Sequence, residues 1–234
     1  MGAIYKREMR SYFTTPIGYI FLSVFLIFSG AVFCYTTLYS FSSNVTNYFT
    51  VMLFLMVILL PLLTMKLLSE ERKQKTEQLL LTAPVSILSV VMAKFLAAYT
   101  IFASATLVSS LSFVILYQYA KVQSATLLGC IVAMLLVGAV FISVGVFVSS
   151  VTESPLASAV GTVAILAFFL FISFVNSFIK VYFIRFIFSS ISIFARFQSF
   201  TQGVFDISAI IYYLAVCAVF LFLTVCVYDK RRWE

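Results

Sequence analysis

The densest group of side chains able to do chemistry lies in one short segment, residues 70–77. It is rich in carboxylates and cations and also carries one hydroxyl, in the order Glu70, Glu71, Arg72, Lys73, Lys75, Thr76 and Glu77. Glu71 and Lys75 have the i,i+4 spacing that favours an ion pair on a helix. Because no nucleophile stands beside a base, these groups suit binding to a charged protein surface rather than catalysis.

The segment predicts a short surface helix, because it is made of good helix formers and Pro84 ends the run. Its charged face would point to water, and the leucines that follow, Leu80 among them, would point to the other helices. Two interpretations stay open here. The segment is either a docking helix for a cytoplasmic partner or a solvated loop whose charges only fix membrane topology.

Residues for enzymatic chemistry are lacking elsewhere. The chain has no His, and its four Cys lie in apolar runs without a C-x-x-C pair, so neither a disulfide nor a metal site is expected. No Gly is followed by Lys, which excludes a Walker A loop. The span centres carry none of the charged residues that ion-coupled carriers use as relays. We therefore expect no catalytic residue, cofactor or metal in this chain.

The composition places the chain in a membrane. Hydrophobic residues make up 63% of it and charged residues only 10%, against about 25% charged in soluble domains. A soluble protein of this size must cover its outside with polar groups. The net charge of +7 does not indicate nucleic acid, because the basic residues cluster at the ends of apolar segments. An all-α polytopic membrane protein is predicted.

Six apolar runs are long enough to cross about 30 Å of hydrocarbon as helices. They cover residues 18–38, 48–68, 87–117, 125–148, 156–174 and 207–227. With the N-terminus inside, ten Lys and Arg residues fall in inside segments and four in outside loops. This bias predicts that both termini are cytoplasmic. Lys94, about two turns into the third run, is expected to snorkel inward.

Two segments outside the spans are also predicted to be helical. Residues 1–16 alternate apolar and charged positions at helical spacing and predict an interfacial helix. Residues 176–206 predict two short re-entrant helices on the outer side, with Gly203 as a stop and Asp206 as a cap for the last span. No linker divides the chain, so residues 1–234 are predicted to form a single domain.

Three separated motifs resemble one family. The stretch EERKQKTEQLLLTAPVS at 70–86, followed by Lys94, looks like the first cytoplasmic loop of ABC-2 type transporter permeases. The start, KRE at 6–8 with SYF at 11–13 and PIGY at 16–19, is similar to the gliding-motility and nitrous-oxide-cluster branch of that family. So is the tail, FQSFTQGVFD at 197–206 with FLFLT at 220–224.

The resemblance implies more than the composition does. It implies the ABC-2, or type V exporter, fold with an interfacial helix at 1–16, a coupling helix at 70–84 and outer re-entrant helices at 176–206. It implies a second permease copy or paralogue and two cytoplasmic ABC ATPase subunits, which would bind ATP and Mg. The resemblance implies that the residues contacting the ATPase are Glu70, Glu71, Arg72, Lys73, Lys75, Thr76, Glu77 and Leu80.

For Glu153, in the short loop between the fourth and fifth spans, the resemblance offers a second docking contact. A plain turn that caps a helix is the alternative. The family resemblance also points to a bacterial plasma (inner) membrane.

The predicted function is a transmembrane permease subunit of an ATP-driven transporter, more specifically an exporter. ATP hydrolysis is expected in a separate subunit, so this chain is not expected to be an enzyme. The alternative is a non-transporting membrane anchor or assembly subunit that transmits ATPase motion to an outer partner. Residues 176–206 suit either function, and the uncharged span centres disfavour an ion channel or secondary carrier.

Overall fold

The computed structural model describes residues 2–40, 45–73, 86–119, 123–176, 192–203 and 206–233. Within these ranges every regular element is a helix, which confirms the all-α class. The elements are α1 (Gly2–Thr14), α2 (Pro16–Phe33), the π-helix η1 (Cys34–Tyr39), α3 (Val45–Thr64), α4 (Ser69–Lys73), α6 (Ile87–Ser110), α7 (Ser112–Tyr119), α8 (Ser124–Val151), α9 (Pro155–Asn176), α11 (Ile193–Thr201) and α12 (Ile207–Trp233).

Six of the described segments are long and apolar enough to span a membrane, as predicted. They are Pro16–Tyr39, Val45–Lys73, Ile87–Val114, Ser124–Val151, Pro155–Val175 and Ile207–Arg231. The third differs from the predicted single helix, because it is interrupted at Leu111 between α6 and α7. The hydroxyls of Ser109 and Ser110 donate to backbone carbonyls three residues earlier, and such local bonds compete with the helical ladder.

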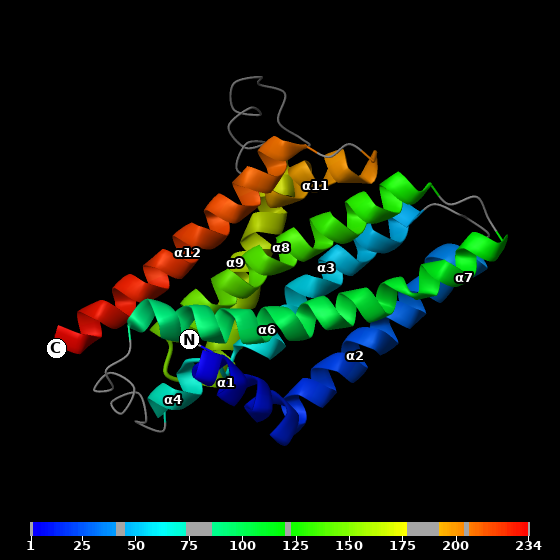
Figure 1. Cartoon of the computed structure of the whole chain (residues 1–234). Helices are drawn as coiled ribbons and strands as arrows, with labels where there is room; N and C mark the ends of the chain where they lie inside the picture. The colour runs from blue at the N-terminus through cyan, green and yellow to red at the C-terminus, as the bar shows by residue number, and fades with distance from the viewer. Residues whose placement is uncertain are drawn as a thin grey trace.

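Helix α8 forms the centre of the bundle. It packs against α3, α6, α9, α11 and α12 and lies between them in Figure 1. In its apolar stretch, 67% of the residues are buried. Gly138 allows this close packing, because a Cβ atom there would overlap the ring of Phe102 on α6.

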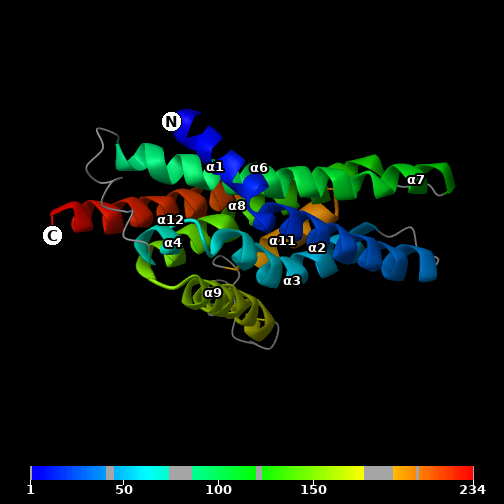
Figure 2. The same cartoon turned by 90° about the horizontal axis from the view of Figure 1, so that it is seen from below.

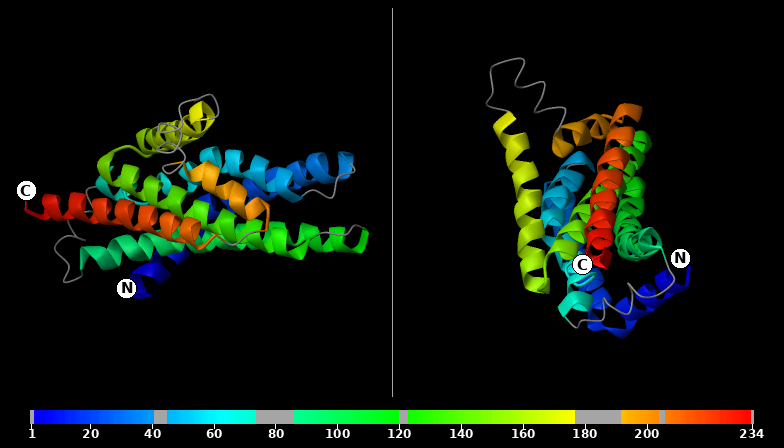
Figure 3. Two further views of the ribbon diagram at one scale, coloured as in Figure 1. Left: turned by 90° about the horizontal axis from the view of Figure 1, so that it is seen from above. Right: turned by 90° about the vertical axis from the view of Figure 1, so that its left-hand side faces the viewer.

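Helix α9 follows α8 in sequence but lies at the edge of the bundle (Figures 2 and 3). Only 17% of its apolar stretch is buried. One side packs on α8 and α3, and the other carries exposed apolar residues. These are Leu156, Val160, Phe168, Phe171 and Phe174. A helix that is apolar all round but packed on one side leaves a face for lipid or for another protein.

Helix α1 runs steeply across the direction of the spans (Figures 1 and 2), as a helix separate from the first span. Both termini lie toward the end of the bundle where α1 and α4 are found. We call this end, with α1, α4 and the turn between α8 and α9, the terminal end. The other end, where α3 begins and where α7 and α11 lie, is the opposite end.

At the opposite end, α11 is the only part of the predicted 176–206 helix pair that the described residues include. The Ser192 hydroxyl accepts a bond from the Ala195 amide and caps the helix. Its apolar side is buried through Ile193, Phe197 and Phe200. Gly203, at φ +75°, ends it, and Asp206 Oδ1 accepts from the Ser208 amide at 2.9 Å at the start of α12.

Candidate functional site

A buried lysine joins three elements at the terminal end. Lys94, near the start of α6, is 1% exposed. Its ammonium donates to the Leu67 carbonyl at 2.7 Å, to Glu71 Oε1 at 2.9 Å and to Glu8 Oε1 at 3.3 Å. The three donors of a lysine thus meet three acceptors, from the α3–α4 turn, α4 and α1. A buried charge is tolerated only when it is paired in this way.

Arg7 closes this group on the solvent side. Its guanidinium lies 2.8 Å from Glu8 Oε1 and 3.2 Å from Glu71 Oε1, and its side chain is 57% exposed. The bond with Glu8, together with the charges of Glu8 and Glu71, raises the pKa of Arg7 above its ordinary value although partial burial opposes this. Two cations and two carboxylates therefore form a neutral cluster, which we call the Lys94 cluster: Arg7, Glu8, Glu71 and Lys94.

Tyrosines fix α1 against the bundle on either side of this cluster. The Tyr5 hydroxyl donates to Thr100 Oγ1 on α6 at 3.2 Å. The Tyr12 hydroxyl donates to the Leu63 carbonyl on α3, also at 3.2 Å. Burial raises the pKa of Tyr12 well above its ordinary value, so this phenol stays protonated and remains a donor. Helix α1 is thus tied to two spans as well as to α4.

The other side of α4 is tied to the α8–α9 turn. Arg72 pairs with Glu153 Oε1 at 2.6 Å and donates to the Val151 carbonyl at 2.7 Å. The Ser149 hydroxyl of α8 accepts from the Leu68 and Ser69 amides, both at 3.1 Å. These amides have no helical partner at the start of α4, and the hydroxyl satisfies them. Helix α4 is therefore held between α1 and α6 on one side and α8 on the other.

The structure separates the predicted docking residues into different roles. Glu71 pairs with Lys94, and Arg72 pairs with Glu153. Glu70 is half-buried and Lys73 is exposed. The predicted residues Lys75, Thr76, Glu77 and Leu80 lie outside the described residues, as does most of the 70–84 helix.

Sequence reasoning missed three members of the Lys94 cluster. The sequence predicts Arg7 and Glu8 as residues of an interfacial helix and of a family motif, and Lys94 as a lysine that snorkels inward, but it does not predict that they meet. The Lys94 side chain is buried, and it pairs with residues 86 and 23 positions away. One signal was available, because a lysine two turns inside an apolar run needs a counter-charge.

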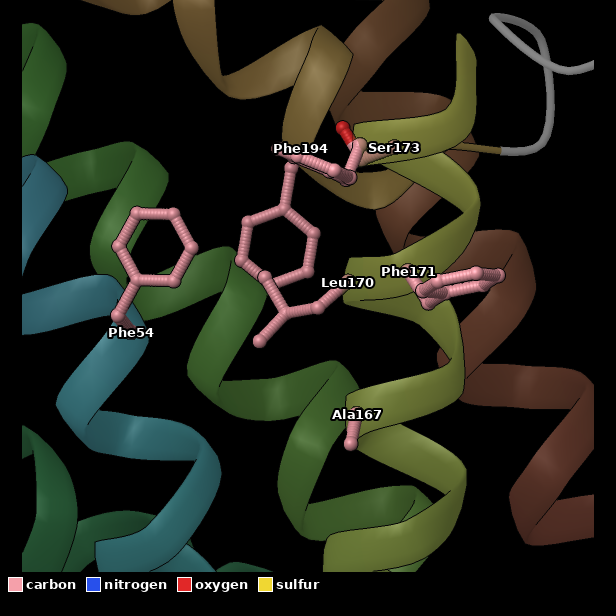
Figure 4. Close-up of a pocket in the computed structure, with 7 residues that line it drawn as sticks. Phe54, Ala167, Leu170, Phe171, Ser173 and Phe194 are labelled. Carbon is pink, nitrogen blue, oxygen red and sulfur yellow. The ribbon is translucent and has the colours of Figure 1, made fainter.

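A cavity of about 440 Å³ lies between α3, α9 and α11, nearer the opposite end (Figure 4). Among the described residues its lining is apolar apart from the Ser173 hydroxyl, and includes Phe54, Ala167, Leu170, Phe171, Ser173, Phe174 and Phe194. Phe54 and Phe194 stack with ring centroids 5.9 Å apart and form its inner wall. Two of its lining residues, Phe171 and Phe174, are also among the exposed residues of α9.

No group of three metal-ligating side chains occurs among the described residues. The contacts that the structure describes at the terminal end are ion pairs and hydrogen bonds. The chemistry available at the cavity is apolar contact with one hydroxyl.

Six apolar spans and a charged terminal end define a multi-pass membrane protein. The chain also matches the family model described as ABC-2 family transporter protein over residues 3–233, which is nearly its whole length. It therefore belongs to the ABC-2 transporter family and is a permease component of an ABC transporter. No curated protein matches the chain closely enough to count as a relative.

Proposed function

We propose that this chain is the permease subunit of an ATP-driven exporter whose energy comes from a separate ATPase subunit. The observation that carries the proposal is the position of α4. It is joined to α1 and α6 through Lys94, and to α8 and α9 through Ser149 and the Arg72–Glu153 pair. A force applied to α4 therefore reaches four other helices through short polar contacts instead of being absorbed by one loop.

The proposed docking surface consists of the outward-facing groups around α4. Lys73 is exposed, and the Glu153 side chain is 74% exposed although it pairs with Arg72. Lys75, Thr76, Glu77 and Leu80 follow directly in the sequence and extend the surface in this proposal. Glu71 and Lys94 act as positioning residues behind it. Two ATPase subunits would bind ATP and Mg, and this chain would bind neither.

A second permease copy or paralogue is proposed to cover the exposed side of α9. Ala157, Val160, Ala164, Ala167, Phe171 and Phe174 follow one another at alternating spacings of three and four. This spacing is typical of a helix that packs against another helix, and the small residues allow close approach. The cavity beside α9 would then face the partner, and its apolar lining suits a lipid-soluble or amphiphilic cargo.

The proposed orientation places the terminal end in the cytoplasm of a bacterium, with the spans in the inner membrane. The excess of Lys and Arg at this end supports that orientation. The apolar cavity supports export as the proposed direction, because its lining suits a cargo taken up from the bilayer.

The test is co-purification of the full chain with the ATPase encoded next to it, from a membrane in which both are produced. We expect a stable complex with the wild type. Lys73→Glu and Glu153→Lys should each weaken it at least tenfold, because each reverses one charge of the docking surface. The double variant, which has the wild-type net charge, shows whether local charge or total charge matters. Gln123→Glu, an exposed position at the opposite end, is the control.

The outcomes separate the proposals. If the wild type binds no ATPase, the chain has no source of energy from that partner, and the proposal of an ATP-driven exporter fails. If the single variants bind like the wild type, the docking surface lies elsewhere. If the complex forms and hydrolyses ATP but membrane vesicles move no amphiphilic cargo, the chain is a membrane anchor that transmits motion instead of an exporter.

A further inference from the structure

One face of α1 is cationic and takes no part in the contacts described above. Ala3, Lys6, Arg10 and Phe13 recur at spacings of three and four and are all exposed. They therefore share one face of the helix. Tyr5, Met9 and Tyr12, on the other face, pack against the bundle. The exposed face is thus a separate surface, which we call the α1 outer face.

The cations of this face are Lys6 and Arg10. Neither Lys6 nor Arg10 forms an ion pair with a carboxylate in the part of the chain that the structure describes. The only acidic residue of α1, Glu8, turns toward Lys94. Two unpaired cations on one helix face attract a negatively charged ligand.

The aromatic residues place this face at the membrane boundary. Phe13 contacts Tyr19 edge-to-face, with ring centroids 5.7 Å apart, and the rings are 43% and 56% exposed. Tyr19 lies in the first turn of α2, where the first span begins. Exposed aromatic pairs at the start of a span are typical of the headgroup level of a bilayer.

The direction of α1 keeps its cations at that level. Helix α1 runs largely across the direction of the spans (Figures 1 and 2), so the residues along it stay near the level at which the first span begins. Arg10 and Lys6 lie about 5 Å and 10 Å along the helix from Phe13, by the helical rise of 1.5 Å per residue. Lys6 and Arg10 are thus about one helical turn apart, close enough for both to contact the headgroup of one lipid.

We propose that the α1 outer face binds a phospholipid with an anionic headgroup. Lys6 and Arg10 contact the phosphate and the negatively charged headgroup, while Phe13 and Tyr19 contact the glycerol and upper acyl region. The bound lipid holds α1 in place and thereby keeps Glu8 on Lys94. The inference does not depend on an ATPase, on cargo or on the direction of transport, because it concerns only this face and the bilayer.

The experiment uses the purified, delipidated full chain in detergent, titrated with phosphatidylglycerol or phosphatidylcholine and followed by native mass spectrometry. The wild type should bind phosphatidylglycerol more tightly. Lys6→Gln and Arg10→Gln should each weaken that binding about fivefold, and the double variant about 25-fold, because each surface cation contributes about one such factor. Affinity for phosphatidylcholine should stay unchanged.

A matched control removes two other cations from the terminal end, in Lys73→Gln/Lys230→Gln. It should keep phosphatidylglycerol affinity within about twofold, since lipid attraction depends on cations close to the headgroup. Soluble glycerol phosphate should not compete, because it lacks the apolar part that Phe13 and Tyr19 contact. The proposal is overturned if the wild type binds both lipids equally, if the control loses as much affinity as the α1 double variant, or if glycerol phosphate competes fully.

Discussion

The two ends of the bundle are held together by different forces. At the terminal end, Lys94 joins α1, α4 and α6 through charged hydrogen bonds. At the opposite end, α2, α3 and α7 meet in a cluster of rings in which Tyr48, Phe49 and Phe113 contact one another at centroid distances of 4.9–5.6 Å. A neutral hydrogen bond, 2.8 Å between the Ser29 and Tyr48 hydroxyls, accompanies the rings.

This difference determines how each end responds to force. Charged hydrogen bonds are directional and short, so helices joined by them move together or the bonds break. Ring contacts are numerous and individually weak, and they survive small changes of angle or offset. The terminal end is therefore suited to transmit a displacement from a partner, whereas the opposite end is suited to adapt its packing.

The largest expected effect comes from removing the cation at the centre of the terminal end. Lys94→Met leaves Glu8 and Glu71 beside each other without the buried ammonium that both of them contact. We expect a loss of about 3 kcal/mol in the free energy of unfolding, because breaking a buried pair leaves an uncompensated charge. Unfolding by sodium dodecyl sulfate in mixed micelles measures it.

Two variants control this result. Lys73→Met removes an exposed lysine of α4 and should change the free energy of unfolding by less than about 0.5 kcal/mol. Lys94→Met/Glu71→Gln removes both charges and should cost less than the sum of the single changes, because the two groups interact. Equal losses for Lys94→Met and Lys73→Met would show that the Lys94 cluster does not hold the terminal end together.

The second effect concerns α8, which connects the two ends. In Gly138→Ala the new methyl group would overlap Phe102, a ring that is fully buried and also contacts Phe25 edge-to-face. We expect a loss of about 2 kcal/mol, because overpacking forces the ring or the helix to shift. The same unfolding measurement applies.

Gly30→Ala on α2 is the matched control, because a Cβ atom there would meet nothing within 4 Å. It should leave stability unchanged or raise it by up to about 1 kcal/mol through better helix propensity. A loss in Gly30→Ala as large as in Gly138→Ala would mean that glycine flexibility, and not the close contact of α6 and α8, explains the effect.

The sequence was sufficient for the class of fold and the spans. A long apolar run is stable in lipid as a helix, because a helix pairs its own backbone N–H and C=O groups where no water can bond to them. For that reason the six spans could be predicted. The break at Leu111 could not, because the serine hydroxyls before it are compatible with a continuous helix as well.

The site could be predicted only in part, for a physical reason. Residues near 70 stood out because charges are rare in this chain and cluster there. Their partners Glu8 and Lys94 could not be recognised as partners in the sequence. They belong to helices that are far apart in the sequence, and no local pattern specifies how those helices pack. Only the cost of burying a lysine indicates that Lys94 needs a carboxylate, and that cost does not say which one.

The smallest effect tests the opposite end. Tyr48→Phe keeps the ring contacts with Phe49 and Phe113 and removes the hydroxyl that pairs with Ser29. We expect a loss of about 1 kcal/mol in the free energy of unfolding, the ordinary value for one neutral hydrogen bond whose buried partner loses it. Tyr48→Phe/Ser29→Ala should recover most of that loss, because no polar group of the pair is then left unpaired. A loss in Tyr48→Phe as large as that in Lys94→Met would contradict the comparison, because the opposite end would then depend on polar contacts as strongly as the terminal end does.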